Sequence, residues 1–364
     1  MKRGKKLLAL LLAGVMAASL AGCGGSGETK AETQNSQVSA GADEGAQTTA
    51  EAGGQTASSD QAAPSGDMRK IGVIQLAEHP ALDASYEGFV DALAERGYVD
   101  GENIVLDYNN AGGDISNCTT IAEKLVNNNS DLVLAIATPA AQAVAAKTTT
   151  IPIVGTAITD FAEAGLVDDN DAPGTNVSGS SDMNPIAEQL DLLKQLLPDA
   201  KKIGIMYCSS EDNSRVQAEL AEAVCQQLEL EWEEYTVSDS SMIQSVTESM
   251  IGKVDAVYVP TDNLLAEAMA TVTMITNANG LPCIVGEEGM VENGGLGTYG
   301  LSYYNLGRMA GEMAADVLEG ADISTLAVQR VAAEDCTLCI NTTAAADLEV
   351  TIPEELLSKA TIVE

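Results

Sequence analysis

Residues 69–364 alternate between short apolar segments and segments whose apolar residues have helical spacing, and this order then starts again. A short apolar run bounded by turn residues is typical of a strand that is buried on both faces. Strands that alternate with helices form a parallel sheet with helices on its faces. Because the whole order occurs twice, we predict two similar doubly wound α/β lobes.

The predicted elements follow the same order in each half. In the first half we expect strands at 71–76, 103–108, 131–137 and 151–155, and helices at 84–96, 115–127 and after 138–139. In the second half we expect strands at 202–207, 232–237, 255–260 and 282–285, and helices at 186–197, 214–228, 241–250 and 264–277. Periodicity also predicts a helix at 305–318, but it does not assign this helix to either lobe.

The composition excludes several classes of function. The net charge is −36, and nucleic-acid binding or adhesion to an anionic membrane needs clustered Lys and Arg. The chain has one histidine, His79, so a His-rich metal site or a Ser-His-Asp hydrolase is not expected unless His79 is the base. We predict no nucleic-acid partner, no metal and no cofactor.

The N-terminus has the features of an export signal. Basic residues precede an apolar segment, 7–20, that is too short to be a typical membrane span. Residues 20–23 read Leu-Ala-Gly-Cys, which resembles the bacterial lipobox. We therefore expect cleavage after residue 22, acylation of the Cys23 thiol, and a protein anchored on the outer side of the cell membrane. The alternative is an ordinary secretory signal that precedes an incidental cysteine.

Residues 24–68 are rich in Gly, Ser, Thr, Ala and Gln and contain no aromatic residue. Such a segment buries little apolar surface, so we predict that 23–68 is a lipidated cysteine followed by a disordered tether. Six cysteines follow it without a regular disulfide spacing. The CxxC pair Cys336 and Cys339 lies in a strand-like segment, and we favour free or incidentally paired thiols over a redox or metal role.

Polar residues follow several of the predicted strands. In open parallel sheets, ligands bind beyond the carboxyl ends of the strands, where helices begin. The polar segments are 77–80, 138–139, 159–161, 208–214 and 260–263, with 180–185 between the lobes. Each Ser, Asp or Asn could simply cap a helix, but recurrence in both halves favours one shared cleft. The chain contains neither GxxxxGK[ST] nor GxGxxG, so no motif supports nucleotide binding.

Six segments carry a family resemblance. They are 75–83 (Gln-Leu-Ala-Glu-His-Pro-Ala-Leu-Asp), 137–142 (Ala-Thr-Pro-Ala-Ala-Gln), 157–160 (Ala-Ile-Thr-Asp), 181–185 (Ser-Asp-Met-Asn-Pro), 209–214 (Ser-Ser-Glu-Asp-Asn-Ser) and 259–263 (Val-Pro-Thr-Asp-Asn). Together they resemble the substrate-binding lipoproteins of ABC importers, in the group related to tryptophan- and tyrosine-binding proteins. The resemblance covers about residues 69–360. It implies two lobes of the type I periplasmic-binding-protein kind, joined by three crossovers.

The resemblance also implies a division of the chain. The crossovers are expected near 179–182, 297–303 and 325–331. The expected parts are a signal peptide at 1–22, the tether at 23–68, an N-terminal lobe of 69–180 with about 300–325, and a C-terminal lobe of 181–299 with about 326–364. Proteins of this family close around a ligand like a hinged clamp and dock onto a permease. We expect a monomer.

The implied ligand is an amino acid, commonly an aromatic one. Its carboxylate needs hydroxyl groups and free backbone N–H groups at helix starts, and its ammonium needs carboxylates. The carboxylate candidates are Thr138 and Ala140 in one lobe and Ser209, Ser210 and Asn213 in the other. The ammonium candidates are Asp160, Asp182 and Asp262. Asp212 is either a further contact or a helix cap.

An aromatic ligand needs an apolar or π-rich wall. The aromatic candidates are His79, Phe161, Tyr207, Tyr299 and Tyr303, although Tyr207 could be a core residue and the last two could serve the hinge. Asn184 and Asn263 lie in the polar loops. Glu287 follows a strand at the position that Asp160 takes in the other half. We expect these residues to line the cleft together.

Three classes of function remain to be compared. The leading prediction is a binding lipoprotein that delivers its ligand to an ABC permease. The alternative is a ligand-sensing lipoprotein that signals through a separate membrane partner, which would share the fold and the cleft. An enzyme is not expected, because no paired nucleophile and base support one.

Overall fold

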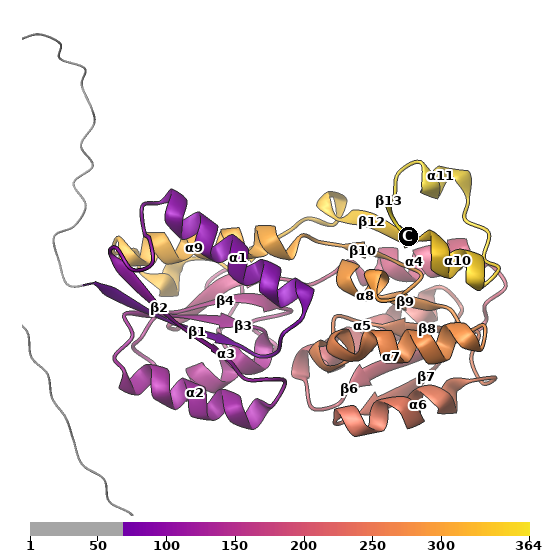
Figure 1. Ribbon diagram of the computed structural model, residues 1–364, viewed down its shortest axis with the longest axis horizontal. Coiled ribbons are helices and arrows are strands. Elements are labelled where there is room, and N and C mark those ends of the chain that lie inside the picture. The colour runs from indigo at the N-terminus through magenta and orange to yellow at the C-terminus, as the bar shows by residue number, and fades with distance from the viewer. Residues whose placement is uncertain (1–67) are drawn as a thin grey trace, which may run out of the picture. The chain divides into compact units, whose positions relative to one another are not determined.

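The computed structural model describes residues 68–364. The predicted export signal, Cys23 and the tether up to residue 67 therefore lie outside the described residues. The described residues form two sheets, one of six strands and one of seven, each covered by helices (Figure 1). Among residues 68–364, no helix is both long enough and apolar enough to cross a membrane.

The N-terminal lobe contains the six-stranded sheet, in the order β11-β5-β4-β3-β1-β2, and all its strands are parallel. Its strands are β1 (Arg69–Gln75), β2 (Ile104–Asn110), β3 (Leu132–Ile136), β4 (Ile153–Ile158), β5 (Val177–Ser181) and β11 (Gln329–Arg330). Its helices are α1 (Pro80–Glu95), α2 (Ile115–Asn127), α3 (Thr138–Ala145) and α9 (Tyr303–Leu318). Figure 1 shows α1 and α9 on one face of this sheet and α2 and α3 on the other.

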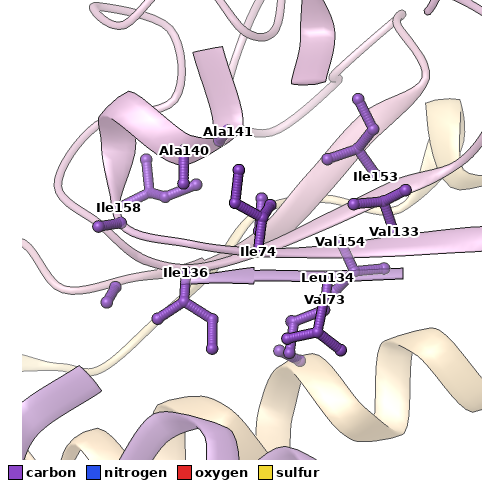
Figure 2. Packing of buried hydrophobic residues seen from close by; sticks show 14 of the residues in the cluster. Val73, Ile74, Val133, Leu134, Ile136, Ala140, Ala141, Ile153, Val154 and Ile158 are labelled. Atoms are coloured by element: carbon purple, nitrogen blue, oxygen red, sulfur yellow. The ribbon is translucent and has the colours of Figure 1, made fainter. Parts of the chain in front are cut away.

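The core of this lobe follows from the alternation of side chains along buried parallel strands. In Figure 2, Ile74 and Val133 point to the face on which α3 places Ala140 and Ala141. Leu134 points the opposite way, toward the other helical layer. Strands buried on both faces therefore appear in the sequence as continuous apolar runs, which is why β1 and β3 were readily predicted.

The C-terminal lobe contains the seven-stranded sheet, in the order β13-β12-β10-β9-β8-β6-β7. The β10–β12 pair is antiparallel and β12–β13 is parallel, so β12 and β13 run opposite to the other five strands. Its strands are β6 (Lys202–Cys208), β7 (Glu231–Val237), β8 (Ala256–Val259), β9 (Cys283–Val285), β10 (Gly297–Gly300), β12 (Thr337–Asn341) and β13 (Thr361–Val363). Its helices are α4 (Ile186–Leu196), α5 (Asp212–Gln227), α6 (Ile243–Met250), α7 (Asn263–Ala278), α8 (Glu288–Glu292), α10 (Thr342–Asp347) and α11 (Glu354–Leu357). Short 3-10 turns lie at Ser240–Met242, Ile323–Thr325 and Ala333–Asp335.

The chain passes between the two sheets three times. Residues 182–185 join β5 to α4, residues 301–302 join β10 to α9, and residues 331–336 join β11 to β12. The third passage lies later than the expected 325–331, because β11 pairs with β5 and keeps residues 326–330 in the N-terminal lobe. A strand of two residues has no periodicity that a sequence could reveal.

Candidate functional site

A cavity lies between the lobes, at the carboxyl ends of β1, β4, β8 and β9. It is lined by His79, Leu82, Ala157, Thr159, Asp182, Asn213, Thr261, Asp262, Asn263, Ala266, Glu287 and Tyr303. The cavity between these residues has a volume of about 10 Å³. This is room for about one water, so a larger ligand requires the lobes to move apart or shift.

Three of the lining residues are the N-caps of helices that follow strands. His79 precedes α1, Asp262 precedes α7 and Glu287 precedes α8. The Asp262 carboxylate accepts a hydrogen bond from the backbone N–H of Leu265 at 2.9 Å, and Glu287 accepts one from Gly289 at 2.7 Å. The strand-to-helix connections of a parallel sheet thus bring three helix N-termini to one cavity.

A β-bulge shapes the wall that the N-terminal lobe contributes. The register between β4 and β5 shifts between Gly155 and Ile158, and Ala157 has a φ of 55°. A left-handed conformation costs a residue with a Cβ about 1 kcal/mol or more, and such strain concentrates at functional sites. The bulge places both Ala157 and Thr159 in the cavity wall.

The cavity is lined by three buried carboxyl groups and by no Lys or Arg. Burial raises the pKa of Asp182 and of Asp262, and it raises the pKa of Glu287 to about 7. Asp182 accepts hydrogen bonds from Thr159 Oγ1 at 3.1 Å and from Tyr303 Oη at 2.9 Å. Buried carboxylates without a cation are costly, and a positive charge placed beside them would favour their ionised form.

His79 faces this cavity with a neutral ring. It is 8% exposed, and neither ring nitrogen has a hydrogen-bond partner among the described residues. Burial lowers the pKa of His79 to about 4, and the neighbouring Asn263 amide and Asp83 carboxylate only partly offset this effect. Buried polar atoms in native proteins are normally satisfied, so the unpartnered ring nitrogens are available to a ligand.

Six of the site residues expected from the sequence lie together on the cavity wall. They are His79, Asp182, Asn213, Asp262, Asn263 and Glu287. Tyr303, one of the aromatic candidates, joins them and presents its ring from the start of α9. These side chains come from both lobes and lie on the wall of one cavity.

Four expected residues of the N-terminal lobe lie off the wall. Asp160 accepts hydrogen bonds from the backbone N–H groups of Ala162 and Glu163, so its carboxylate closes a turn. Phe161 and Ala140 are fully buried in the hydrophobic core. Thr138 is buried at the start of α3, where its hydroxyl has no partner within residues 68–364.

The other four lie in the first crossover and in the C-terminal lobe. The hydroxyl groups of Ser209 and Ser210 donate to the backbone carbonyls of Val237 and Ser238, which fixes them at the edge of the lobe. Tyr299 lies in β10 and packs against the core of its lobe. Asn184 donates to the carbonyl of Asp182 at 3.0 Å, so it braces the crossover behind the wall.

Several lining residues were not singled out from the sequence. Thr159 and Thr261 lie in segments that were expected to face the cleft, but neither was chosen as a contact. Leu82 and Ala266 each come three residues after a lining residue, His79 or Asn263. Residues three apart share a helix face, so helical spacing from these two positions could have identified both. Ala157 depends on the bulge, for which the sequence carries no turn signal.

Other kinds of site receive no support within residues 68–364. No group of three or more His, Cys, Asp or Glu side chains there is arranged to hold a metal ion. The six cysteines in this range are free thiols, and five of them are buried. Burial raises the pKa of the Cys339 thiol to about 12, which opposes the thiolate that redox or metal chemistry would need.

The chain is similar to known binding proteins over nearly all its described length. The sequence profile of the ABC transporter substrate-binding proteins matches residues 70–364. A tyrosine-binding protein of Clostridioides difficile strain R20291 is 40% identical over 329 residues, which are 90% of this chain and 88% of that protein. A crystal structure from Streptococcus pneumoniae, an ABC domain in complex with L-Trp, shares 40% identity and a TM-score of 0.79, covering 82% of this chain and 100% of that one.

A third similar protein allows a comparison of conformations. It is a substrate-binding protein with adhesive properties from Clostridium difficile, solved in a ligand-free, open form. It is also 40% identical to this chain, and the alignment covers 82% of this chain and 99% of that one. Its TM-score, however, is 0.63. At equal identity and coverage, the arrangement of the present chain is closer to the ligand-bound structure than to the open one. The small volume of the cavity agrees with a closed arrangement.

Proposed function

This chain belongs to the ABC transporter substrate-binding protein family, and we propose that it captures a free aromatic amino acid in the cavity between its lobes. The observation that carries the proposal is the charge of the wall. Asp182, Asp262 and Glu287 are buried there, and no Lys or Arg lines the cavity. A ligand with an ammonium group supplies the missing positive charge, and pairing with a carboxylate is stronger than a neutral hydrogen bond.

The free carboxylate of the ligand needs donors rather than acceptors. A neutral His79 carries one ring N–H, and this ring has no protein partner within the described residues. The helix N-termini that meet at the cavity add a positive potential. A zwitterion therefore finds complementary groups for both its charges on the same wall.

The remaining wall suits a flat apolar side chain. Leu82, Ala157 and Ala266 supply apolar surface, and the rings of His79 and Tyr303 supply π-faces. The alanine side chains are small, so a modest separation of the lobes makes room for a bulky ring, and aromatic pairs are favourable beyond the area they bury. The tyrosine-binding relative and the L-Trp complex support an aromatic ligand for this chain.

Delivery to a transporter completes the proposed function. The chain closes its two lobes around the amino acid, as the comparison of TM-scores supports, and hands the ligand to an ABC permease without chemical change. Acylated Cys23 holds the exported protein on the outer face of the cell membrane, and the tether gives it reach. We propose that it acts as a monomer.

A thermal-shift panel of all amino acids tests this proposal. The purified protein is first partially unfolded and dialysed, so that no ligand carried over from the cells remains. L-Trp or L-Tyr is expected to raise the melting temperature, because a ligand at 100 times its Kd stabilises the folded state by about 2.7 kcal/mol. If no amino acid shifts the melting temperature, the proposal is wrong.

A further inference from the structure

Glu211 is a buried carboxyl behind the cavity wall, and the sequence did not single it out. It is 4% exposed and is the N-cap residue of α5. Its Oε2 accepts hydrogen bonds from Nδ2 of Asn213 at 3.3 Å and from Nδ2 of Asn263 at 2.5 Å. The backbone N–H groups of Asn263 and Leu264 also donate to this carboxylate, at 3.3 and 3.2 Å. One side chain thus ties the loop after β6 to the start of α7.

These contacts determine which way the two amides face. An ionised carboxylate only accepts hydrogen bonds, so each amide must turn its nitrogen toward Glu211. The oxygen of each amide then points to the other side, and both Asn213 and Asn263 line the cavity. Oδ1 of Asn213 is buried without a hydrogen-bond partner among residues 68–364. An amide oxygen buried in this way is explained by a donor that arrives with the ligand.

Asp262 is less suited to that role than the sequence suggested. Its two carboxylate oxygens accept hydrogen bonds from the backbone N–H groups of Cys208 and Leu265. It therefore joins β6 to α7 and supports the wall. Oδ1 of Asn213 beside it has no partner among residues 68–364 and is the less committed acceptor of this lobe.

We propose that Glu211 is a positioning residue that holds the amide oxygens of Asn213 and Asn263 toward the cavity, where they accept hydrogen bonds from the ammonium group of the ligand. This inference rests on the proposed amino-acid function and assigns the ammonium subsite within it.

Burial and the charge of Asp262 raise the pKa of Glu211 to about 7. The titratable groups that face Glu211 are Asp262 and the thiol of Cys208. A bound ammonium favours the ionised carboxylate that the orientation requires.

The test variant is Glu211→Gln, which keeps the shape of the side chain. The new amide can donate to either asparagine oxygen, so the variant no longer imposes the orientation of Asn263 and weakens that of Asn213, whose Nδ2 also donates to the Thr261 carbonyl at 3.4 Å. Kd is measured by titration calorimetry for L-Trp and for indole-3-propionate, which has the same ring and carboxylate but no ammonium. We expect the variant to bind L-Trp about tenfold more weakly, as the loss of about 1.4 kcal/mol implies, and to bind indole-3-propionate within twofold of wild type.

Two further variants keep the test decisive. Asn213→Leu removes one amide oxygen and should give the same selective loss for L-Trp, even if Glu211→Gln does not fold. Glu219→Gln, an exposed change on the same helix α5, should bind both ligands like wild type. The inference is wrong if a site variant loses the same affinity for both ligands, or if neither site variant loses affinity for L-Trp. Either result leaves the proposed function standing. A wild-type protein that binds no amino acid overturns the proposed function, and this inference with it.

Discussion

Tyr303 donates its hydroxyl hydrogen to Oδ2 of Asp182 at 2.9 Å, and this bond joins two of the three segments that connect the lobes. Asp182 begins the first passage between the sheets, and Tyr303 directly follows the second. Both residues line the cavity. Asp182 and Tyr303 therefore belong both to the cavity wall and to the connections between the lobes.

The first prediction concerns that bond. Tyr303→Phe leaves Asp182 with Thr159 as its remaining side-chain donor, and a buried hydrogen bond to a charged group contributes about 1.5–3 kcal/mol. We expect the free energy of unfolding in urea to fall by this amount. The control is Tyr304→Phe, which removes a bond of 2.7 Å to Asp91 at an exposed position and should cost about 0.5 kcal/mol or less. Equal losses in the two variants would contradict the role given to Tyr303.

The second prediction concerns the structural role of Asp262. Asp262→Ala removes the side-chain cap of α7 and the bond to the Cys208 N–H, so we expect stability to fall by about 2 kcal/mol, the upper end of the cost of a lost cap. Asp114→Ala removes an exposed cap of α2, which accepts from Ser116 N at 2.8 Å. It should cost less in the same urea titration. A stability loss at Asp262 no larger than that at Asp114 would show that the buried contacts contribute little.

The third prediction is a pH dependence of stability. Because burial raises the pKa of Glu287 from 4.5 to about 7, the folded state holds this proton more tightly than the unfolded state. The contribution to stability is present below about pH 4.5 and is lost as the pH rises through 7. Glu287→Gln should therefore gain stability relative to wild type between pH 5 and 8, by at most about 3 kcal/mol.

Urea titrations at four pH values across that range measure this effect. Glu288→Gln is the matched control, because Glu288 is the exposed neighbour of Glu287. As an exposed substitution it should stay within about 0.5 kcal/mol of wild type. If both variants follow wild type at every pH, the buried Glu287 carboxyl is not the titrating group.

The fourth prediction concerns the rate of ligand release. Gln142 on α3 donates to Oδ2 of Asp212 on α5 at 3.0 Å, so the two lobes are joined by a side-chain hydrogen bond at the protein surface. Gln142→Ala should raise the dissociation rate of the bound amino acid about two- to tenfold and leave the association rate near that of wild type. Stopped-flow fluorescence measures both rates. Gln195→Ala, an exposed change on α4, should alter neither, and an unchanged dissociation rate in Gln142→Ala would rule out this contact as a latch.

Much of the fold could be predicted because its strands are buried on both faces. Continuous apolar runs identified β1, β3, β6 and β8, and helical spacing gave α2 the same limits, 115–127, that the structure has. Short elements escaped detection. Strand β11 has two residues and helix α8 has five, which is too few for either period to show.

The site was predictable to the extent that topology determines it. Residues that follow parallel strands must meet at one edge, which is why His79 and Asn263 were found although they lie far apart in the sequence. The sequence does not show which polar side chains form hydrogen bonds within the protein and are therefore not available to a ligand. The carboxylate of Asp160 accepts hydrogen bonds from backbone N–H groups of the turn that follows it. The role of Glu211 depends on two amides whose orientation only the folded contacts define.

A crystal structure of the protein grown with L-Trp tests the central claim most directly. We expect the amino acid to occupy the cavity between the lobes, with its ammonium nitrogen about 3 Å from Oδ1 of Asn213 and its ring beside His79 and Tyr303. Electron density for the amino acid at any other position, or an empty cavity in crystals grown at saturating L-Trp, would contradict it.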